Sequence, residues 1–242
     1  CVINNIIDQD IDIKMERTRN RALVNNTVSS RAAFVYAALL GILGFSLLYF
    51  YANLLAVAFA ALGFLVYVVL YSLYLKRHSV HQTLFGSISG ACPPVIGYCA
   101  VSQQFDAGAL ILFIIFCIWQ MPHSFAIAIY RLNDYVSARI PVLPAKKGIH
   151  ITKVQSLLYV VAFVIAGSML YVFHYVGLLY LIVFMLLSAY WLYLAISGFK
   201  AIDERVWARR FFLFSVIAIS LFSLLISVDY LPNPAPIFIF KI

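Results

Sequence analysis

Apolar runs about as long as a bilayer is thick determine what this chain can fold into. A hydrocarbon core of ~30 Å is crossed by ~20 helical residues. The sequence predicts seven such spans, at residues 31–50, 54–75, 82–101, 107–130, 153–173, 175–197 and 211–229. Only helices and closed barrels satisfy a backbone in lipid, and barrel strands are about half as long as these runs and alternate in polarity. We therefore expect an all-α integral membrane protein.

The composition excludes a soluble domain and a nucleic-acid-binding protein. Of the 242 residues, 64% are hydrophobic and 11% are charged. The net charge of +8 comes from bases in the short loops between spans, so it does not indicate nucleic acid. The cysteines form no CxxC pair, and Cys92, Cys99 and Cys117 lie inside spans, so we interpret them as reduced packing residues.

The positive charges fall almost entirely on one side of the predicted spans. If residues 1–30 lie inside, 16 of the 17 bases lie in or beside inside loops, and only Lys241 lies outside. The inside set is Lys14, Arg17, Arg19, Arg21, Arg31, Lys76, Arg77, Arg131, Arg139, Lys146, Lys147, Lys153, Lys200, Arg205, Arg209 and Arg210. The positive-inside rule then places this face, and the active site with it, in the cytoplasm.

An acidic stretch near the start of the chain has a helical spacing. Asn4, Asp8 and Asp12 recur every four residues, which on a helix stacks them on one face, whereas Asp10 points elsewhere. Two carboxylates and an amide oxygen suit Mg²⁺, which fills its remaining positions with water or substrate phosphate. We expect Asp8 and Asp12 to face solvent as metal ligands.

A run of bases follows the acids directly. Lys14, Arg17, Arg19 and Arg21 provide cations beside the predicted metal site, and this combination is typical of a diphosphate site. The alternative is a solvated loop with ordinary charges, which the four-residue spacing disfavours.

The end of the fourth span carries a second group of candidates. Pro122 removes a backbone hydrogen bond and is expected to open the helix there. His123 is ionisable within the membrane, which suggests function, although a histidine hydrogen-bonded to a neighbouring helix is the alternative. Asp134 lies on the same side as Asp8 and could complete the metal site; alternatively it pairs with a nearby arginine.

Three further patterns precede the fourth span. Lys76, Arg77, His78 and His81 form a cationic patch that could hold diphosphate or the carboxylates of an acidic substrate, or simply anchor the loop inside. A stripe of aromatic residues on the second span could line a prenyl channel, or could be ordinary packing; it comprises Phe64, Tyr67, Tyr71 and Tyr74. Gly86 and Gly90 form a GxxxG pattern, which indicates close helix packing.

Several motifs together resemble those of a known family. They are Asn4-xxx-Asp8-xxx-Asp12 with Arg17-Thr18 and Arg21, then the stretches 74–79 (YLKRHS), 93–98 (PPVIGY), 119–124 (WQMPHS) and 140–144 (IPVLP). With them the chain resembles the UbiA superfamily of intramembrane prenyltransferases, and within it the branch that farnesylates heme. The first motif is shared by the superfamily, whereas the histidine-containing stretches are specific to the heme branch.

The resemblance implies a fold of nine helices around a central cavity, capped by cytoplasmic loops. This chain is expected to be one transmembrane domain, residues 1–242, with seven complete helices; it lacks the family's N-terminal helix and most of the second. Many superfamily members carry two or three aspartates in a second acidic loop, where this chain has only Asp134 beside Asn133.

The resemblance also implies an activity: transfer of a farnesyl group from farnesyl diphosphate to a vinyl of heme B, giving heme O for heme-copper terminal oxidases. The resemblance implies Mg²⁺ as the cofactor and a bacterial inner membrane as the location. A heme A synthase or a terminal oxidase that acts downstream is a possible partner. The implied catalytic residues are Asp8, Asp12, Asn4 and Asp134, the first three also holding the metal; diphosphate would be bound by Lys14, Arg17, Arg21 and Arg131, and heme by His123, His78, His81, Lys76 and Arg77.

Two alternatives stay open at this point. A sister enzyme that prenylates a quinone precursor or chlorophyllide would share the acidic motif but would not need the stretch 119–124. A non-enzymatic membrane heme carrier would explain the histidines but not the Asn/Asp/Asp spacing beside arginines.

Overall fold

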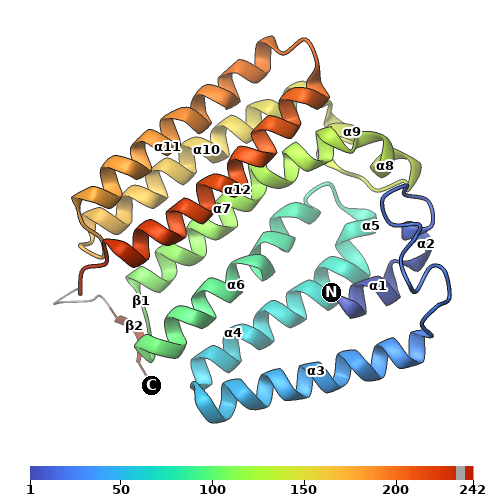
Figure 1. Cartoon of the computed structure of the whole chain (residues 1–242), viewed down its shortest axis with the longest axis horizontal. Coiled ribbons are helices and arrows are strands. Elements are labelled where there is room, and N and C mark those ends of the chain that lie inside the picture. The colour runs from blue at the N-terminus through green and yellow to red at the C-terminus, as the bar shows by residue number, and fades with distance from the viewer. Residues whose placement is uncertain (233–237, 242) are drawn as a thin grey trace.

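The computed structural model of the protein describes residues 1–232 and 238–241 and is a bundle of long helices lying side by side (Figure 1). Seven helices in this part of the chain are long and apolar enough to cross a membrane. The chain is therefore a multi-pass integral membrane protein, and the predicted all-α membrane class is confirmed.

The helices and strands follow one another along the chain with short connections. In order they are α1 (Val2–Ile7), α2 (Gln9–Asp12), α3 (Ser30–Tyr51), α4 (Leu54–Leu65), the π-helix η1 (Val66–Leu75), α5 (Lys76–His78), α6 (Gln82–Ser102), β1 (Gln104–Asp106), α7 (Ala107–Tyr130), α8 (Leu132–Ser137), α9 (Leu143–Lys147), α10 (Ile149–Val172), α11 (Leu178–Ser197), the 3₁₀ turn η2 (Gly198–Lys200), α12 (Glu204–Val228) and β2 (Phe238–Lys241).

Helix starts coincide with polar side chains that satisfy free backbone N–H groups. Ser29 Oγ accepts from Ala32 N at 3.2 Å before α3, and Asn53 Oδ1 accepts from Ala56 N at 2.9 Å before α4. Asp106 caps α7 in the same way. These are the residue types favoured at this position, and they explain why turns as short as that at Asn53 end one span and begin the next.

Two spans begin earlier than the apolar runs predicted. Helix α10 starts at Ile149, not at residue 153, and α12 starts at Glu204, not at residue 211. Asp203 caps α12, and Trp207 and Phe211 are buried on its inner face. The charged segment before residue 211 is therefore an amphipathic helix end that projects beyond the apolar run, and hydropathy alone does not reveal it.

Segments expected to be irregular also contain structure. The polar loop after the fourth span holds α8 and α9. Residues 103–106, expected to be a turn, include β1, which pairs with β2 in an antiparallel register of Gln104 with Lys241. Pro122 was expected to open α7, but the helix runs unbroken through it. Pro122 is buried, and packed neighbouring helices tolerate proline within a membrane span.

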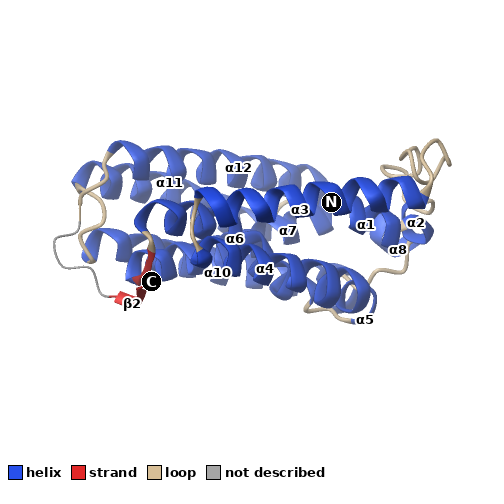
Figure 2. Cartoon of the chain, turned by 90° about the horizontal axis from the view of Figure 1, so that it is seen from below, coloured by secondary structure: helices blue, strands red, loops and turns tan. Residues whose placement is uncertain are grey.

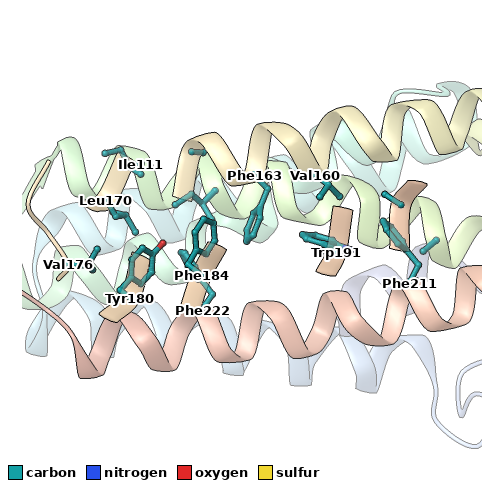
Figure 3. Packing of buried hydrophobic residues seen from close by; sticks show 14 of the residues in the cluster. Ile111, Val160, Phe163, Leu170, Val176, Tyr180, Phe184, Trp191, Phe211 and Phe222 are labelled. Carbon is teal, nitrogen blue, oxygen red and sulfur yellow. The ribbon is translucent and has the colours of Figure 1, made fainter. Parts of the chain in front are cut away.

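The densest packing lies among α7, α10, α11 and α12. Phe163, Phe184, Trp191 and Phe222 are almost wholly buried there and meet edge-on or tilted (Figure 3). In contrast, Ala33 is the one buried residue of α3. This half of the bundle forms a rigid support for α7, which carries residues of the site described below.

The elements of the site gather at one end of the bundle. Helices α1, α2, α5 and α8 lie at that end, and β2 lies at the opposite end (Figure 2). The loops around Asp12, His78 and Asp134 thus share one face of the molecule, as the charge distribution predicted.

Candidate functional site

The acidic stretch forms two short helices that meet at Asp8. The backbone there departs from helical geometry, at φ −93° and ψ 7°. Backbone bonds nevertheless continue across the break, from Asp8 N to Asn4 O at 2.9 Å and from Asp12 N to Asp8 O at 2.8 Å. Asn4, Asp8 and Asp12 therefore stay in successive turns on one face, as their spacing predicted.

The two carboxylates of this face are buried, which corrects the expectation that they face solvent. Asp8 is 0% exposed and Asp12 is 3% exposed. Asp8 forms an ion pair with Lys76, and Arg21 Nη1 donates to Asp12 Oδ2 at 2.7 Å. Cations that pack over the acids exclude water from them, and a count of charges along the sequence cannot show this.

Of the remaining polar atoms of this face, one is held by a distant helix and one has no partner. Ser72 in η1 donates to Asn4 Oδ1 at 2.9 Å. Asp8 Oδ1 is buried and has no hydrogen-bond partner among the described residues. A buried carboxylate oxygen without a donor is costly, and it suits a hard cation.

Asp10 points away from this face, as predicted. Arg77 holds it through two bonds of 2.7 Å, and the Asp10 side chain is largely exposed. The hydrogen bonds from Arg77 lower the pKa of the Asp10 carboxyl below its ordinary value. Arg77 also donates to Ile7 O at 2.9 Å, so it fastens α1 to α5. A contact of Arg77 with heme stays a prediction.

A cavity of about 330 Å³ opens beside the acidic face. Its lining combines ionic groups, tyrosines and neutral polar side chains, which come from several of the sequence motifs. The lining residues are Asn4, Asp12, Met15, Arg17, Arg21, Tyr67, Tyr71, Lys76, Gln82, Thr83, Gly86, Ser87, Gln120, Ser124, Ile127, Ala128, Tyr135, Ile140 and Val142. A cavity lined by both cations and aromatic rings fits an amphiphile with an anionic head.

Two of the four bases predicted to bind diphosphate, Arg17 and Arg21, line this cavity, and Lys76 of the predicted cationic patch lines it with them. The other two of the four lie elsewhere: Lys14 is exposed and is not part of the lining, and Arg131 lies over the Tyr130 ring at 4.7 Å. The sequence correctly identified a cationic group but not which members turn inward.

Asp134 does not join the acidic face. It lines a separate cavity of about 310 Å³ together with Glu16, Arg131, Glu204 and Arg205. Among the described residues, no three His, Cys, Asp or Glu side chains come together to hold a metal. Asp134 thus lines a different cavity from Asp12, and its contribution to a metal site stays a prediction.

The three histidines proposed for heme lie outside the main cavity. His123 Nδ1 is 2.8 Å from Ser215 Oγ, and its ring packs between Trp119 and Phe212. His78 is exposed and stacks on Tyr74. His81 is exposed and lines a third cavity of about 440 Å³ between α6, α7 and α10. For His123 this placement favours the alternative of a histidine hydrogen-bonded to a neighbouring helix.

The four residues of the aromatic stripe do not all face the cavity. Tyr67 and Tyr71 line the cavity and stack at 5.8 Å, whereas Phe64 and Tyr74 are exposed. In an α-helix, residues five apart differ by about 140° in direction, whereas i→i+5 bonding stacks them. The π conformation thus lets Tyr71 and Lys76 line the same cavity.

Neutral polar residues of α6 and α7 complete the wall, and the sequence reading did not select them. Gln82, Thr83, Gln120 and Ser124 are among them. The available signal was Gly90: a Cβ there would lie 2.0 Å from Gln120 Oε1, so only glycine lets this side chain approach. The GxxxG pattern thus marks close packing, as interpreted, and also marks the cavity wall.

Comparison with known proteins finds similarity to one family along most of the chain. Residues 1–217 match the model of the UbiA prenyltransferase family. A protoheme IX farnesyltransferase of Pectobacterium carotovorum is 60% identical over 230 residues, covering 95% of this chain and 78% of that protein. A protein of the same name from Acinetobacter baylyi is 56% identical over 236 residues, covering 98% and 80%.

A solved structure shares the fold. It comes from work on digeranylgeranylglyceryl phosphate synthase in membranes, and it superposes with a TM-score of 0.76 at 22% identity. The match covers 94% of this chain and 79% of that one. At this identity the likeness establishes the helical arrangement alone.

Proposed function

This chain belongs to the UbiA prenyltransferase family, and from that premise we propose that it transfers a farnesyl group from farnesyl diphosphate to a vinyl of heme B, giving heme O. Relatives of 56–61% identity along nearly the whole chain carry the name protoheme IX farnesyltransferase. The observation that carries the proposal is the cavity in which Asp12, Arg17, Arg21 and Lys76 meet aromatic walls.

We assign the head of the cavity to the diphosphate. Arg17, Arg21 and Lys76 line it, and cations bind and neutralise a departing diphosphate. Tyr67 and Tyr71 line the cavity with stacked rings, and their π electrons would stabilise the allylic cation that ionisation leaves. The electron-rich vinyl then attacks this cation, so the chain supplies no nucleophile of its own.

The oxygen donors of the acidic face fit Mg²⁺. Asp8, Asp12 and Asn4 would hold it, because Mg²⁺ needs only one or two carboxylates and completes its shell with water and phosphate. When bound, the ion supplies charge neutralisation at the diphosphate. Asp8 Oδ1, buried and without a donor, is the atom of this set that most needs a cation.

We further propose that the loop end of the bundle faces the cytoplasm across a bacterial inner membrane. The sources of the relatives are bacteria, and the bases gather on this end. A single catalytic domain spanning residues 1–242, and delivery of heme O to a heme A synthase or terminal oxidase, stay predictions of the sequence.

The test is product identity. Purified protein in detergent, given heme B, farnesyl diphosphate and Mg²⁺, is expected to form hydroxyethylfarnesyl heme, detected by mass. The Asp12→Asn variant is the matched control, since it keeps the shape of a group that lines the cavity and removes its charge; it should bind heme yet form little product. Prenylation of an aromatic acid, with heme B left unchanged, would contradict the proposal.

A further inference from the structure

The wall of the main cavity contributed by α6 and α7 carries neutral polar groups within membrane-spanning helices. Gln82 and Thr83 lie in the first turn of α6, and Gln120 and Ser124 lie one turn apart on α7. All four line the cavity. Polar side chains inside a membrane protein are costly unless partnered, so their convergence on one cavity requires a ligand.

Two polar atoms of this wall, one on each helix, have no hydrogen-bond partner among the described residues. Gln82 is 4% exposed, and its Nε2 donates to none of the described residues. Gln120 Nε2 is satisfied by Ser87 O at 3.2 Å and Phe116 O at 2.8 Å, which leaves its Oε1 against Gly90 without a donor. A buried donor on one helix and a free acceptor on the next are what a small neutral hydrogen-bonding molecule needs.

The charge of the wall excludes the anionic parts of the substrates. Lys76, Arg17 and Arg21 provide the cations of this cavity and lie on other elements, whereas the residues of α6 and α7 in its lining are uncharged. Diphosphate and carboxylates bind where cations pair with them. A cluster of amides and hydroxyls instead binds water, which makes two to four hydrogen bonds in such sites.

We propose that this wall, defined by Gln82, Thr83, Gln120 and Ser124, binds the water molecule that becomes the hydroxyl of the product. The inference rests on the proposed function. As the allylic C–O bond breaks, its electron pair leaves with diphosphate. The vinyl π electrons then form the new C–C bond and leave a cation at the vinyl carbon next to the macrocycle. The water oxygen bonds to that carbon, and its proton passes to the released diphosphate.

The proposal makes the composition of the product depend on the wall. A cation that meets no held water loses a proton from the adjacent carbon to diphosphate and becomes an alkene. That product is lighter than the alcohol by one molecule of water. The ratio of alkene to alcohol therefore reports whether water is positioned, and it does so separately from the rate of farnesyl transfer.

The experiment compares Gln82→Leu, Gln120→Leu and Ser124→Ala with the wild type, by mass spectrometry of the heme products in heavy-oxygen water. We expect the alkene fraction to rise several-fold in the variants, while the alcohol that remains carries the heavy oxygen. Gln155→Leu is the matched control: Gln155 lines the third cavity and not the main one, so its products should equal those of the wild type.

Because the ratio is measured only on molecules that turn over, partial misfolding of a variant does not change it. Ser124→Ala removes one hydroxyl from a helix surface and provides the measurement even where a leucine variant accumulates no folded protein. Wild-type ratios in every variant that turns over would overturn the proposal. Failure of the wild type to form any prenylated heme would instead overturn the proposed function, and the water site with it.

Discussion

At the scale of single residues, each acid of the stretch 8–12 has a cation of its own. Asp8 pairs with Lys76 and Asp12 with Arg21, and the carboxylates of both pairs are buried, whereas Asp10 pairs with Arg77 at the surface. The three pairs differ in burial, and burial determines what their loss costs. A surface pair contributes ~0–1 kcal/mol, whereas removal of one partner of a buried pair costs about 3–5 kcal/mol.

Substitution should therefore have different effects at the buried and at the exposed aspartate. We expect Asp8→Ala to abolish turnover and also to lower the melting temperature, because Lys76 is left without its partner. Asp10→Ala should keep most activity and stability. Turnover and thermal unfolding in detergent are the measurements. Equal loss in both variants would show that the segment does not turn Asp10 away.

His123 packs between two helices in the fold, whereas its position in the sequence suggested a contact with heme. Its ring packs between Trp119 and Phe212 and bonds to Ser215, so His123→Ala removes packing between α7 and α12. We expect a loss of ~1–3 kcal/mol in stability, typical of a buried truncation, with heme affinity close to that of the wild type. Thermal unfolding and a heme absorbance titration measure the two effects.

The matched control for His123 is Ser215→Ala, which removes the same hydrogen bond and keeps the ring. It should be milder in stability and equally neutral toward heme. A heme affinity that falls in His123→Ala but not in Ser215→Ala would mean that the imidazole itself contacts the ligand, as the sequence first suggested.

The sequence predicted the acidic face because a four-residue period is a local property of a helix. It did not predict which partners cover that face. The contacts of Asp8 with Lys76 and of Asn4 with Ser72 each span 68 positions, and no local pattern encodes them. The same limit applies to Asp134: the sequence places it on the same side as Asp8, but it does not show which cavity the side chain lines.

At the scale of elements, α6 is shaped by the glycines that face its neighbours. A Cβ at Gly86 would lie 3.2 Å from the Tyr71 ring, and one at Gly90 would lie 2.0 Å from Gln120 Oε1. Because neither glycine has a side chain, η1 can approach α6 at Gly86 and α7 can approach it at Gly90. The cavity exists where these three elements converge.

A methyl group at this point should disturb the site more than the fold. Gly90→Ala meets the far end of a flexible side chain, so Gln120 is expected to swing away and the bundle to stay folded. We expect reduced turnover with a melting temperature near that of the wild type. Gly41→Ala is the control, because nothing lies within 4 Å of a Cβ there. Unchanged turnover in Gly90→Ala would mean that the position of Gln120 does not matter.

The spans were predictable as elements because length and hydropathy are summed over ~20 residues and tolerate local exceptions. Their ends were less predictable. The first turns of α12 are charged yet helical, because Asp203 caps them and Trp207 is buried beneath. The π-helix η1 left no periodic signal, since a change in backbone bonding alters no residue type.

At the scale of the whole molecule, one end of the bundle carries the chemistry and the other carries structural caps. Asp229 Oδ2 accepts from Tyr180 N at 2.7 Å, and Asp106 accepts from Tyr98 at 2.8 Å, both at the end away from the site. These acids stabilise helix starts. The acids of the stretch 8–12 at the site end pair instead with cations, and this asymmetry accompanies the uneven distribution of bases.

The orientation of the bundle follows as a prediction. In a cysteine-free background, single cysteines at the exposed positions Ile13, Val136 and Ile202 should be labelled only from the cytoplasmic side. Val101→Cys, exposed beside β1 at the other end, should be labelled only from outside. Labelling of any of the first three from the outside would break the proposed topology.

The π-helix has a consequence for how this segment tolerates change in length. Lys76 and Arg77 follow directly after the ten residues of η1, so their direction depends on the helical phase accumulated through it. A one-residue deletion that let α-helical bonding resume would change that phase by about 100°. The backbone would gain a commoner geometry, but Lys76 and Arg77 would turn away from their carboxylates, Asp8 and Asp10. The ion pairs that follow η1 thus fix its length, and such a deletion should lower both turnover and thermostability.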